Sequence, residues 1–190
     1  MKRVLICVYV SIVVGGCFKP RPCTPESVAE YIAGQAGISS LSREILVEEL
    51  RLFYEEHFTP AEMPEVFSLV REAAENRGGL AEVAAGALPA IRHFILWDDS
   101  VLIPESNLWV RFEAAAEAAE YADTLITMLR DGGYPEKDLR KLGGRKGKTV
   151  LLRAFFNAAN DQQRRLLIRQ FESPVGRKLI RAGPDLMRRL

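Results

Sequence analysis

The chain has 190 residues, and its 26 Lys and Arg against 25 Asp and Glu leave a net charge of +1 at neutral pH. Hydrophobic residues make up 48% and charged residues 27%, which excludes an intrinsically disordered chain and is typical of a globular protein. The length lies within the usual range for one domain and is sufficient to bury a hydrophobic core. We therefore expect a single folded domain, residues 24–190, after the N-terminal segment.

The N-terminal residues have the three parts of a bacterial export signal. Lys2 and Arg3 form a positive start, residues 4–14 are apolar, and the glycines at 15–16 precede Cys17. The apolar run is much shorter than the about 20 residues that a helix needs to cross the hydrocarbon core of a bilayer. We therefore expect the leader to be removed rather than kept as a transmembrane anchor.

This leader resembles the lipobox of bacterial lipoproteins. The resemblance implies a signal peptide over residues 1–16, cleavage between Gly16 and Cys17, and a diacylglyceryl thioether on Cys17 beside an acylated (palmitate) N-terminus. Two or three acyl chains hold a protein stably on a membrane. Phe18 stands where an aspartate would indicate inner-membrane retention, which favours the periplasmic face of the outer membrane. The alternatives are an ordinary secretory signal that happens to contain a cysteine, or an uncleaved apolar N-terminus.

Residues 17–23 form a tether, because Pro20 and Pro22 forbid a helix there. The chain has three cysteines. Cys7 would leave with the signal peptide and Cys17 would carry lipid, so Cys23 has no intramolecular partner and no disulfide framework is expected. We interpret Cys23 as a spectator thiol, with an intermolecular disulfide as the alternative.

Helix start signals organise the first half of the domain. Thr24 can cap a helix whose first residue is Pro25, and Thr59 with Glu62 forms a capping box. Pro89 should kink or divide the helix in which it lies. Together these signals and the apolar periodicity predict helices over residues 24–36, 40–56, 59–76 and 80–97.

The longest predicted element covers residues 107–130, with Ser106 or Asn107 as its N-cap. Its apolar residues recur at alternating spacings of four and three, which is a heptad seam. The seam could join two copies of the chain, but in a domain of this size a central core helix is the favoured interpretation. Trp97 and Trp109 are expected to fill the core beside it. The seam consists of Leu108, Phe112, Ala115, Ala119, Ala122, Ile126 and Leu129.

Residues 131–148 are rich in Gly and Lys and predict a loop with at most one helical turn. The end of this segment matches a phosphate-binding loop in part, but Leu142 stands where its first glycine should be and no buried strand precedes it. We therefore exclude nucleotide binding and interpret Thr149 as a helix cap. Three short helices are predicted after it, over 150–158, 161–172 and 174–182, the last two capped by Asn160 and Ser173, with a final turn from Pro184.

These elements predict an all-α fold, a compact bundle of about seven to nine short helices around one long alanine-rich helix. A weak internal repeat would divide the bundle into duplicated halves, 40–97 and 149–190, whereas chance similarity between amphipathic helices is the alternative. The repeat pairs Leu50-Arg51-x-Phe53-Tyr54 and Thr59 with Leu152-Arg153-x-Phe155-Phe156 and Asn160.

Residues 171–179 read Phe-Glu-Ser-Pro-Val-Gly-Arg-Lys-Leu, and each has a physical role. Phe171 ends a helix on the core, Ser173 and Pro174 reverse the chain, and Gly176 permits close backbone contact. The segment resembles the C-terminal signature of a family of uncharacterised exported bacterial helical domains. Residues 58–62 are similar to the element that usually precedes this signature, and their position in the first half of the chain indicates duplication or insertion. The resemblance implies no chemistry.

Residues that could carry catalysis are sparse. His57 and His93 are the only histidines, too few for a metal cage or a Ser/His/Asp triad, so we expect no metal, no cofactor and no catalytic residue. Glu56 beside His57 is interpreted as an exposed charge before a turn, and Asp98 with Asp99 as a solvated loop rather than calcium ligands. An enzyme would need residues that only the fold brings together.

The near-neutral total hides a division of charge. Residues 17–136 carry 9 Lys and Arg against 21 Asp and Glu, a balance of −12, and residues 137–190 carry 15 against 4, a balance of +11. Either the two halves neutralise each other, or the basic half forms a face for an anionic partner. The candidate residues for that face are Arg145, Lys146, Lys148, Arg164, Arg165, Arg169, Arg177 and Lys178.

For a membrane-tethered protein, the anionic partner would be phospholipid headgroups, lipopolysaccharide or an acidic protein. Nucleic acid is disfavoured by the export signal and by the scarcity of aromatic residues among these cations. The sequence thus predicts a non-enzymatic cell-envelope lipoprotein that binds a protein partner or an anionic membrane surface. The alternative is an envelope enzyme or accessory subunit with a cleft between its helical hairpins. The pattern does not specify an oligomeric state.

Overall fold

The computed structural model describes residues 23–35, 40–75, 77–99, 101–102 and 106–189. Within these residues the chain forms ten α-helices and no strand, which confirms the predicted all-α bundle. Cys7, the cleavage site at Gly16 and Cys17, and the tether up to residue 22 lie outside the described residues.

Three helices form the N-terminal end of the domain: α2 (Pro25–Gln35), α3 (Ser40–His57) and α4 (Met63–Glu75). Thr24 caps α2 as predicted, because its hydroxyl accepts from the backbone N–H of Ser27 while the Ser27 hydroxyl accepts from the backbone N–H of Thr24. α4 begins at Met63 rather than at Thr59, because residues 60–62 form a turn before it.

The next helix, α5 (Arg77–Trp97), runs through Pro89, so of the two predicted effects, a kink or a division, the proline does not cause the division. Ser106 caps α6 (Asn107–Ala118), and α7 (Tyr121–Asp131) follows it. The single helix predicted over 107–130 is therefore wrong, because Glu120 adopts a left-handed conformation with φ 56° and breaks it. The break gives each piece its own partner, since α6 packs on α10 and α7 packs on α11.

The predicted heptad seam survives this break and faces the interior. All seven of its residues are buried or half-buried, which agrees with a core element rather than an exposed dimer seam. Phe112 is fully buried, with its ring centre 5.3 Å from that of Phe156 and 5.6 Å from that of Phe171. These edge-to-face contacts stabilise the centre of the larger hydrophobic cluster.

Four helices complete the fold: α8 (Glu136–Gly143), α9 (Arg145–Ala158), α10 (Asp161–Glu172) and α11 (Pro174–Arg189). The predicted loop over 131–148 is thus mostly helical, and Thr149 is not a cap. It lies inside α9, where its hydroxyl donates to the carbonyl oxygen of Arg145 at 3.1 Å. Asn160 is confirmed as the cap of α10, and the structure adds a capping box with Gln163. The predicted end of the last helix at 182 is wrong, because α11 continues through Pro184.

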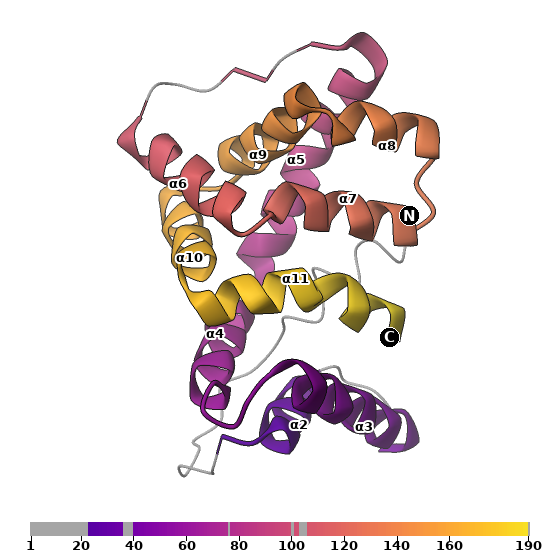
Figure 1. The fold of residues 1–190 in the computed structure, drawn as a ribbon, viewed down its shortest axis with the longest axis vertical. Coiled ribbons are helices and arrows are strands. Elements are labelled where there is room, and N and C mark those ends of the chain that lie inside the picture. Colours follow the sequence, from indigo (N-terminus) through magenta and orange to yellow (C-terminus); the bar gives the residue numbers. More distant parts are fainter. Residues whose placement is uncertain (1–22, 36–39, 76, 100, 103–105, 190) are drawn as a thin grey trace.

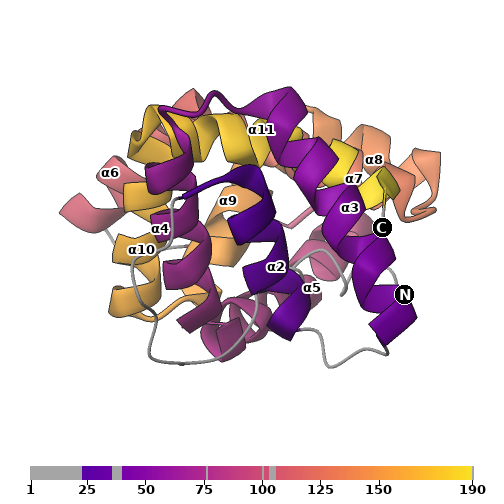
Figure 2. The same ribbon diagram turned by 90° about the horizontal axis from the view of Figure 1, so that it is seen from below.

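The side chains bury two hydrophobic clusters, and α11 lies between them. The larger cluster is built from α5 to α10, and the smaller one from α2, α3 and α4. Val175 and Ala182 of α11 belong to the smaller cluster, while Ile180 packs against the larger one. α11 accordingly crosses the middle of the molecule, between α7 and the α2–α3 pair (Figure 1). Seen from below, α2, α3 and α4 form the layer nearest the viewer (Figure 2).

Two helix corners have the same construction. A Cβ added to Gly147 would lie well under 3.0 Å from the backbone of Lys141, and one added to Gly176 would meet the backbone of Gln170 equally closely. In both cases the glycine is the third residue of a helix and contacts the residue six positions earlier. The α8–α9 and α10–α11 corners are therefore alike, and only glycine fits where their helices meet.

We predict that Gly176→Ala lowers the free energy of unfolding by about 1–3 kcal/mol or more, because the backbone around Gln170 must move to admit the methyl group. Gly143→Ala is the matched control. Its Cβ would meet nothing within 4 Å, so its helix propensity should leave stability unchanged or raise it by about 0.5–1 kcal/mol. Urea unfolding followed by circular dichroism measures both; equal stability of the two variants would contradict the close corner.

Candidate functional site: charged contacts between the two halves

The start of α4 and the start of α11 meet through a polar contact. Glu62 accepts from the backbone N–H of Thr59 at 2.7 Å and from its hydroxyl at 2.9 Å, and the Lys178 ammonium donates to Glu62 at 2.9 Å. Lys178 also lies over the Phe58 ring, 5.3 Å from its centre. The Ser173 hydroxyl donates to Glu65 at 2.5 Å. Segments 58–62 and 171–179, which lie far apart in the sequence, are therefore neighbours in space.

These contacts change the acidity of Glu62. The backbone N–H of Thr59 contributes most, followed by Lys178 and the Thr59 hydroxyl, and together they lower the pKa of Glu62 from 4.5 to about 2. The carboxylate is thus held in its charged form over the whole physiological range. Glu62 consequently acts as a fixed anion that caps one helix and binds another.

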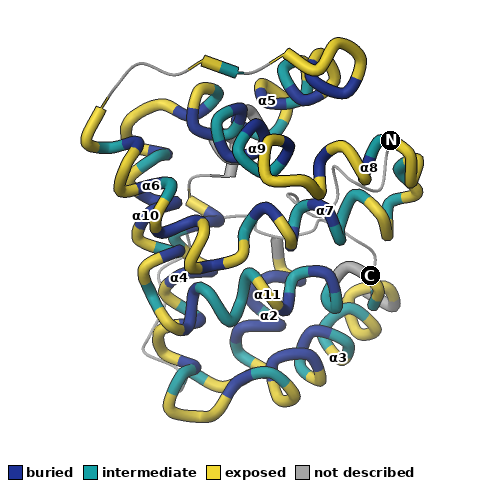
Figure 3. The backbone as a smooth tube through the Cα atoms, turned by 45° about the horizontal axis from the view of Figure 1, so that its top comes forward, coloured by how far each residue is buried: buried dark blue, intermediate teal, exposed yellow. Residues whose placement is uncertain are grey.

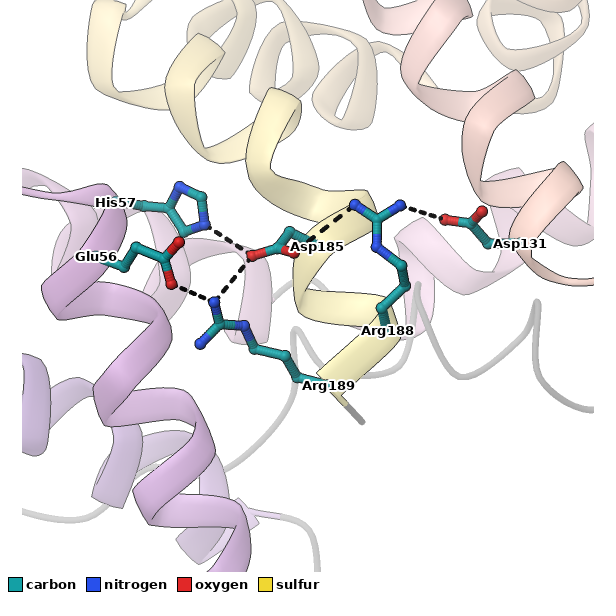
Figure 4. Close-up of polar contacts among 6 residues, drawn as sticks. All are labelled: Glu56, His57, Asp131, Asp185, Arg188 and Arg189. Atoms are coloured by element: carbon teal, nitrogen blue, oxygen red, sulfur yellow. Dashed lines mark hydrogen bonds and ion pairs between the residues drawn. The ribbon is translucent and has the colours of Figure 1, made fainter.

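A second polar cluster joins the end of α11 to the end of α3 (Figure 4). The Nε2 atom of His57 lies 2.9 Å from Oδ2 of Asp185. Arg189 donates to the same Asp185 oxygen at 3.1 Å and also to Glu56. Arg188 extends the cluster by pairing with Asp131 of α7 at 3.2 Å. The hydrogen bond with His57, assisted by Arg189, lowers the pKa of Asp185.

This cluster is a set of ion pairs and hydrogen bonds that joins α11 to α3, and we call its residues, Glu56, His57, Asp185 and Arg189, the clasp. The ligand atoms of Glu56, His57 and Asp185 lie within 4.8 Å of one another, as they would around a metal ion. The guanidinium of Arg189, however, already binds both carboxylates and supplies the positive charge that such an ion would bring. The arrangement holds α11 to α3, and we assign it no metal and no catalytic step.

The eight predicted anion-binding residues lie on three helices and spread along the long axis of the molecule, and most of them contact acidic or backbone groups. Lys146 pairs with Asp98, Lys148 with Asp123, Arg169 with Glu72 and Lys178 with Glu62. Arg164 pairs with Asp161 and lies over the Phe156 ring, and Arg177 donates to the carbonyl oxygens of Phe171 and Glu172. Arg145 and Arg165 are exposed and pair with no residue that the structure describes.

Ion pairs between the acidic half and the basic half recur across the surface. Each is partly exposed, so each contributes about 0–1 kcal/mol, and their combined effect is to cancel the opposite charges of the halves. Mutual neutralisation of the two halves, the first of the two interpretations above, accounts for these contacts. Seven pairs among the described residues join an acid of the first half to a Lys or Arg of the second: Glu56–Arg189, Glu62–Lys178, Glu72–Arg169, Asp98–Lys146, Glu120–Arg181, Asp123–Lys148 and Asp131–Arg188.

Two tryptophans, both expected in the core, differ in their surroundings. Trp109 is buried and stacks near Phe112, as predicted. Trp97 is 70% exposed at the end of α5, so the prediction is wrong for it. Cys23 is a half-buried free thiol that packs on the smaller cluster, which leaves its assignment as a spectator thiol a prediction.

The clasp and the α8–α9 corner at Gly147 were not predicted from the sequence. No local pattern links His57 to Asp185, because 128 residues separate them. The spacing of Asp185, Arg188 and Arg189 was the available signal, since charges three and four apart share one helix face. For the corner, the signal was the shared spacing of Leu142 and Gly147 with Phe171 and Gly176.

Comparison with known proteins adds no family. No protein-family model matches the chain, and neither a curated protein nor a solved structure matches it. Among the described helices, none is long and apolar enough to cross a membrane.

We predict that the Glu62–Lys178 contact makes stability depend on pH. Because folding lowers the pKa of Glu62, its contribution is fully present above pH 4.5 and is lost as the pH falls toward 2. Glu62→Gln should therefore melt at a lower temperature than the parent at pH 7, and the difference should vanish near pH 2. The control is Glu44→Gln, at an exposed position of α3. A Glu62→Gln deficit that stays constant with pH would refute the assignment.

Proposed function

We propose that this chain is a non-enzymatic lipoprotein of the bacterial cell envelope, anchored through Cys17, whose helical domain contacts an anionic membrane surface. The observation that carries the proposal is the leader, in which a positive start and an apolar run end in two glycines and Cys17. The periplasmic face of the outer membrane is the proposed location.

The position of the folded domain supports a role at the membrane surface. Helix α2 starts at Pro25, directly after the tether, and its capping by Thr24 gives the domain a defined beginning. Residues 18–23, fully extended, span at most about 20 Å. A lipid on Cys17 would therefore keep the domain within reach of the headgroups, where weak surface contacts become effective.

Charge that remains after internal pairing supports an anionic partner. Among the exposed cations, Lys137, Arg140, Arg145 and Arg165 form no ion pair with a described residue. Such free cations attract anionic lipid by about 1 kcal/mol each when they lie near the surface. The paired cations, in contrast, serve the fold itself.

Lipid attachment is tested by the intact mass of the protein extracted from membranes. We expect an N-terminus at Cys17 that carries acyl chains. Cys17→Ser should abolish both the lipid mass and the cleavage, whereas Cys23→Ser, the matched control, should leave both unchanged. Cleavage at another residue, or a lipid-free mature protein, would refute the anchor.

Membrane contact is tested separately by co-sedimentation of residues 24–190 with vesicles. We expect binding to vesicles that contain phosphatidylglycerol and much weaker binding to pure phosphatidylcholine. Binding should be weaker at 500 mM than at 50 mM salt, because the added ions screen the exposed cations. Over this range the Debye length falls from about 14 Å to about 4 Å. Absence of binding to anionic vesicles would exclude this contact and favour an acidic protein partner.

A further inference from the structure

The last turn of α5 exposes two large apolar side chains. Leu96 and Trp97 are each 70% exposed, while the preceding Phe94 and Ile95 are buried in the larger cluster. A surface helix normally carries polar residues on its outer face, so a helix end that is apolar on both sides is unusual. The left-handed Asp98, with φ 58°, ends the helix immediately afterwards. The exposed pair therefore lies in the last turn of α5, a helix whose backbone carries both buried and exposed positions (Figure 3).

The α8–α9 corner is bound to this end of α5. The Lys141 ammonium donates to the carbonyl oxygen of Ile95 at 2.5 Å, and the Lys146 ammonium donates to that of Asp98 at 2.7 Å. Lys146 also lies over the Phe94 ring, 5.7 Å from its centre. Cations suit the negative end of a helix dipole, and these two satisfy carbonyl groups that the helix leaves free. These contacts hold the corner against the end of α5 that carries the exposed pair.

The α8–α9 corner also carries an excess of positive charge. Lys146 pairs with Asp98, Lys148 pairs with Asp123, and Glu136 pairs with Arg130. Asp99 of the adjoining segment lies 3.5 Å from His93. Apart from these pairs, the exposed cations Lys137, Arg140 and Arg145 of the corner form no ion pair with a described residue, and neither does the acid Asp138. Residues 136–148 contain Lys137, Arg140, Lys141, Arg145, Lys146 and Lys148 against Glu136 and Asp138.

An anionic bilayer matches this combination. Tryptophan concentrates at the boundary between hydrocarbon and headgroups, where its ring is partly in each, and clustered Lys and Arg bind anionic headgroups. We propose that Leu96 and Trp97 insert at the surface of an anionic membrane while Arg140 and Arg145 bind lipid phosphates. We call these four residues the membrane tip; the proposal rests on the proposed membrane contact and names the site that makes it.

The membrane tip lies at the opposite end of the molecule from α2 and α3 (Figure 1). The tether enters the domain at α2, so anchor and tip are attachments at two ends. Their simultaneous contact with one leaflet lays the long axis of the domain along the membrane. The tip thus limits rotation of the domain in a way that a lipid anchor alone would not.

The fluorescence of Trp97 can report on its own insertion, because the chain has two tryptophans and the other one, Trp109, is buried. The full-length protein, extracted from membranes, is placed in vesicles of phosphatidylcholine with or without phosphatidylglycerol, and brominated lipids serve as quenchers. We expect a shift of emission to shorter wavelength and strong quenching in anionic vesicles only. Trp97→Phe should remove this response and leave the signal of Trp109.

Variants locate the contact. Leu96→Ser should weaken the quenching of Trp97. The double variant Arg140→Gln with Arg145→Gln should shift the equilibrium between inserted and free Trp97 about thirtyfold toward the free state, as expected for two lost headgroup contacts. Arg71→Gln is the matched control, since it removes an exposed cation from α4, which belongs to no proposed binding surface, and it should change nothing. Equal quenching in neutral and anionic vesicles, or an equal loss with Arg71→Gln, would overturn the tip.

The outcomes separate the tip from the anchor. Lipid on Cys17 with Trp97 still accessible to aqueous acrylamide would overturn the tip and keep the anchor. Insertion of Trp97 by a chain that proves lipid-free would support the tip and overturn the anchor. A shift of Trp97 emission that follows protein concentration without vesicles would assign the surface to a second copy of the chain and overturn the membrane tip.

Discussion

The packing of α11 between the two hydrophobic clusters is the contact on which the rest of the structure depends. Val175 and Ala182 complete the smaller cluster, and Ile180 packs against the larger one, so this one helix joins the N-terminal helices to the remainder. Polar contacts fix both of its ends, Lys178 to Glu62 near its start and Asp185 to His57 near its end. Hydrophobic burial thus supplies most of the stability, and the ion pairs define the register.

The division of charge along the sequence has a structural explanation in this packing. Where the N-terminal part of the chain lies against the C-terminal helices, seven acids of the first half pair with seven cations of the second. Three of the exposed cations without an ion pair among the described residues, Lys137, Arg140 and Arg145, lie where α8 turns into α9, beside the exposed end of α5. A chain that is nearly neutral in total therefore presents a local positive surface next to a tryptophan, and the pairing inside the fold selects which cations are available to a partner.

Much of the fold could be predicted from local patterns, and the failures have physical causes. The buried face that contains Phe112 and Ile126 could be predicted from the apolar periodicity of the sequence. This periodicity continues across the break at Glu120, because the apolar residues of both helices pack into the core whether or not the helix is continuous. The break itself depends on two partner helices that no local pattern reveals. Trp97 was assigned to the core because burial of tryptophan is the usual outcome. The contact of His57 with Asp185 could not be predicted, because charges so far apart in sequence are matched only by the tertiary fold.

The position of α11, after all the helices that it joins, also governs when the domain can fold. Neither the contact between the two clusters nor the clasp on α3 can form before α11 has been made, so the segments that precede it lack the element that closes the structure. Contacts that join sequence-distant segments are slow to form because the loop-closure entropy must be overcome first. The docking of α11 is therefore the step that sets the pace at which the two clusters are joined into one fold.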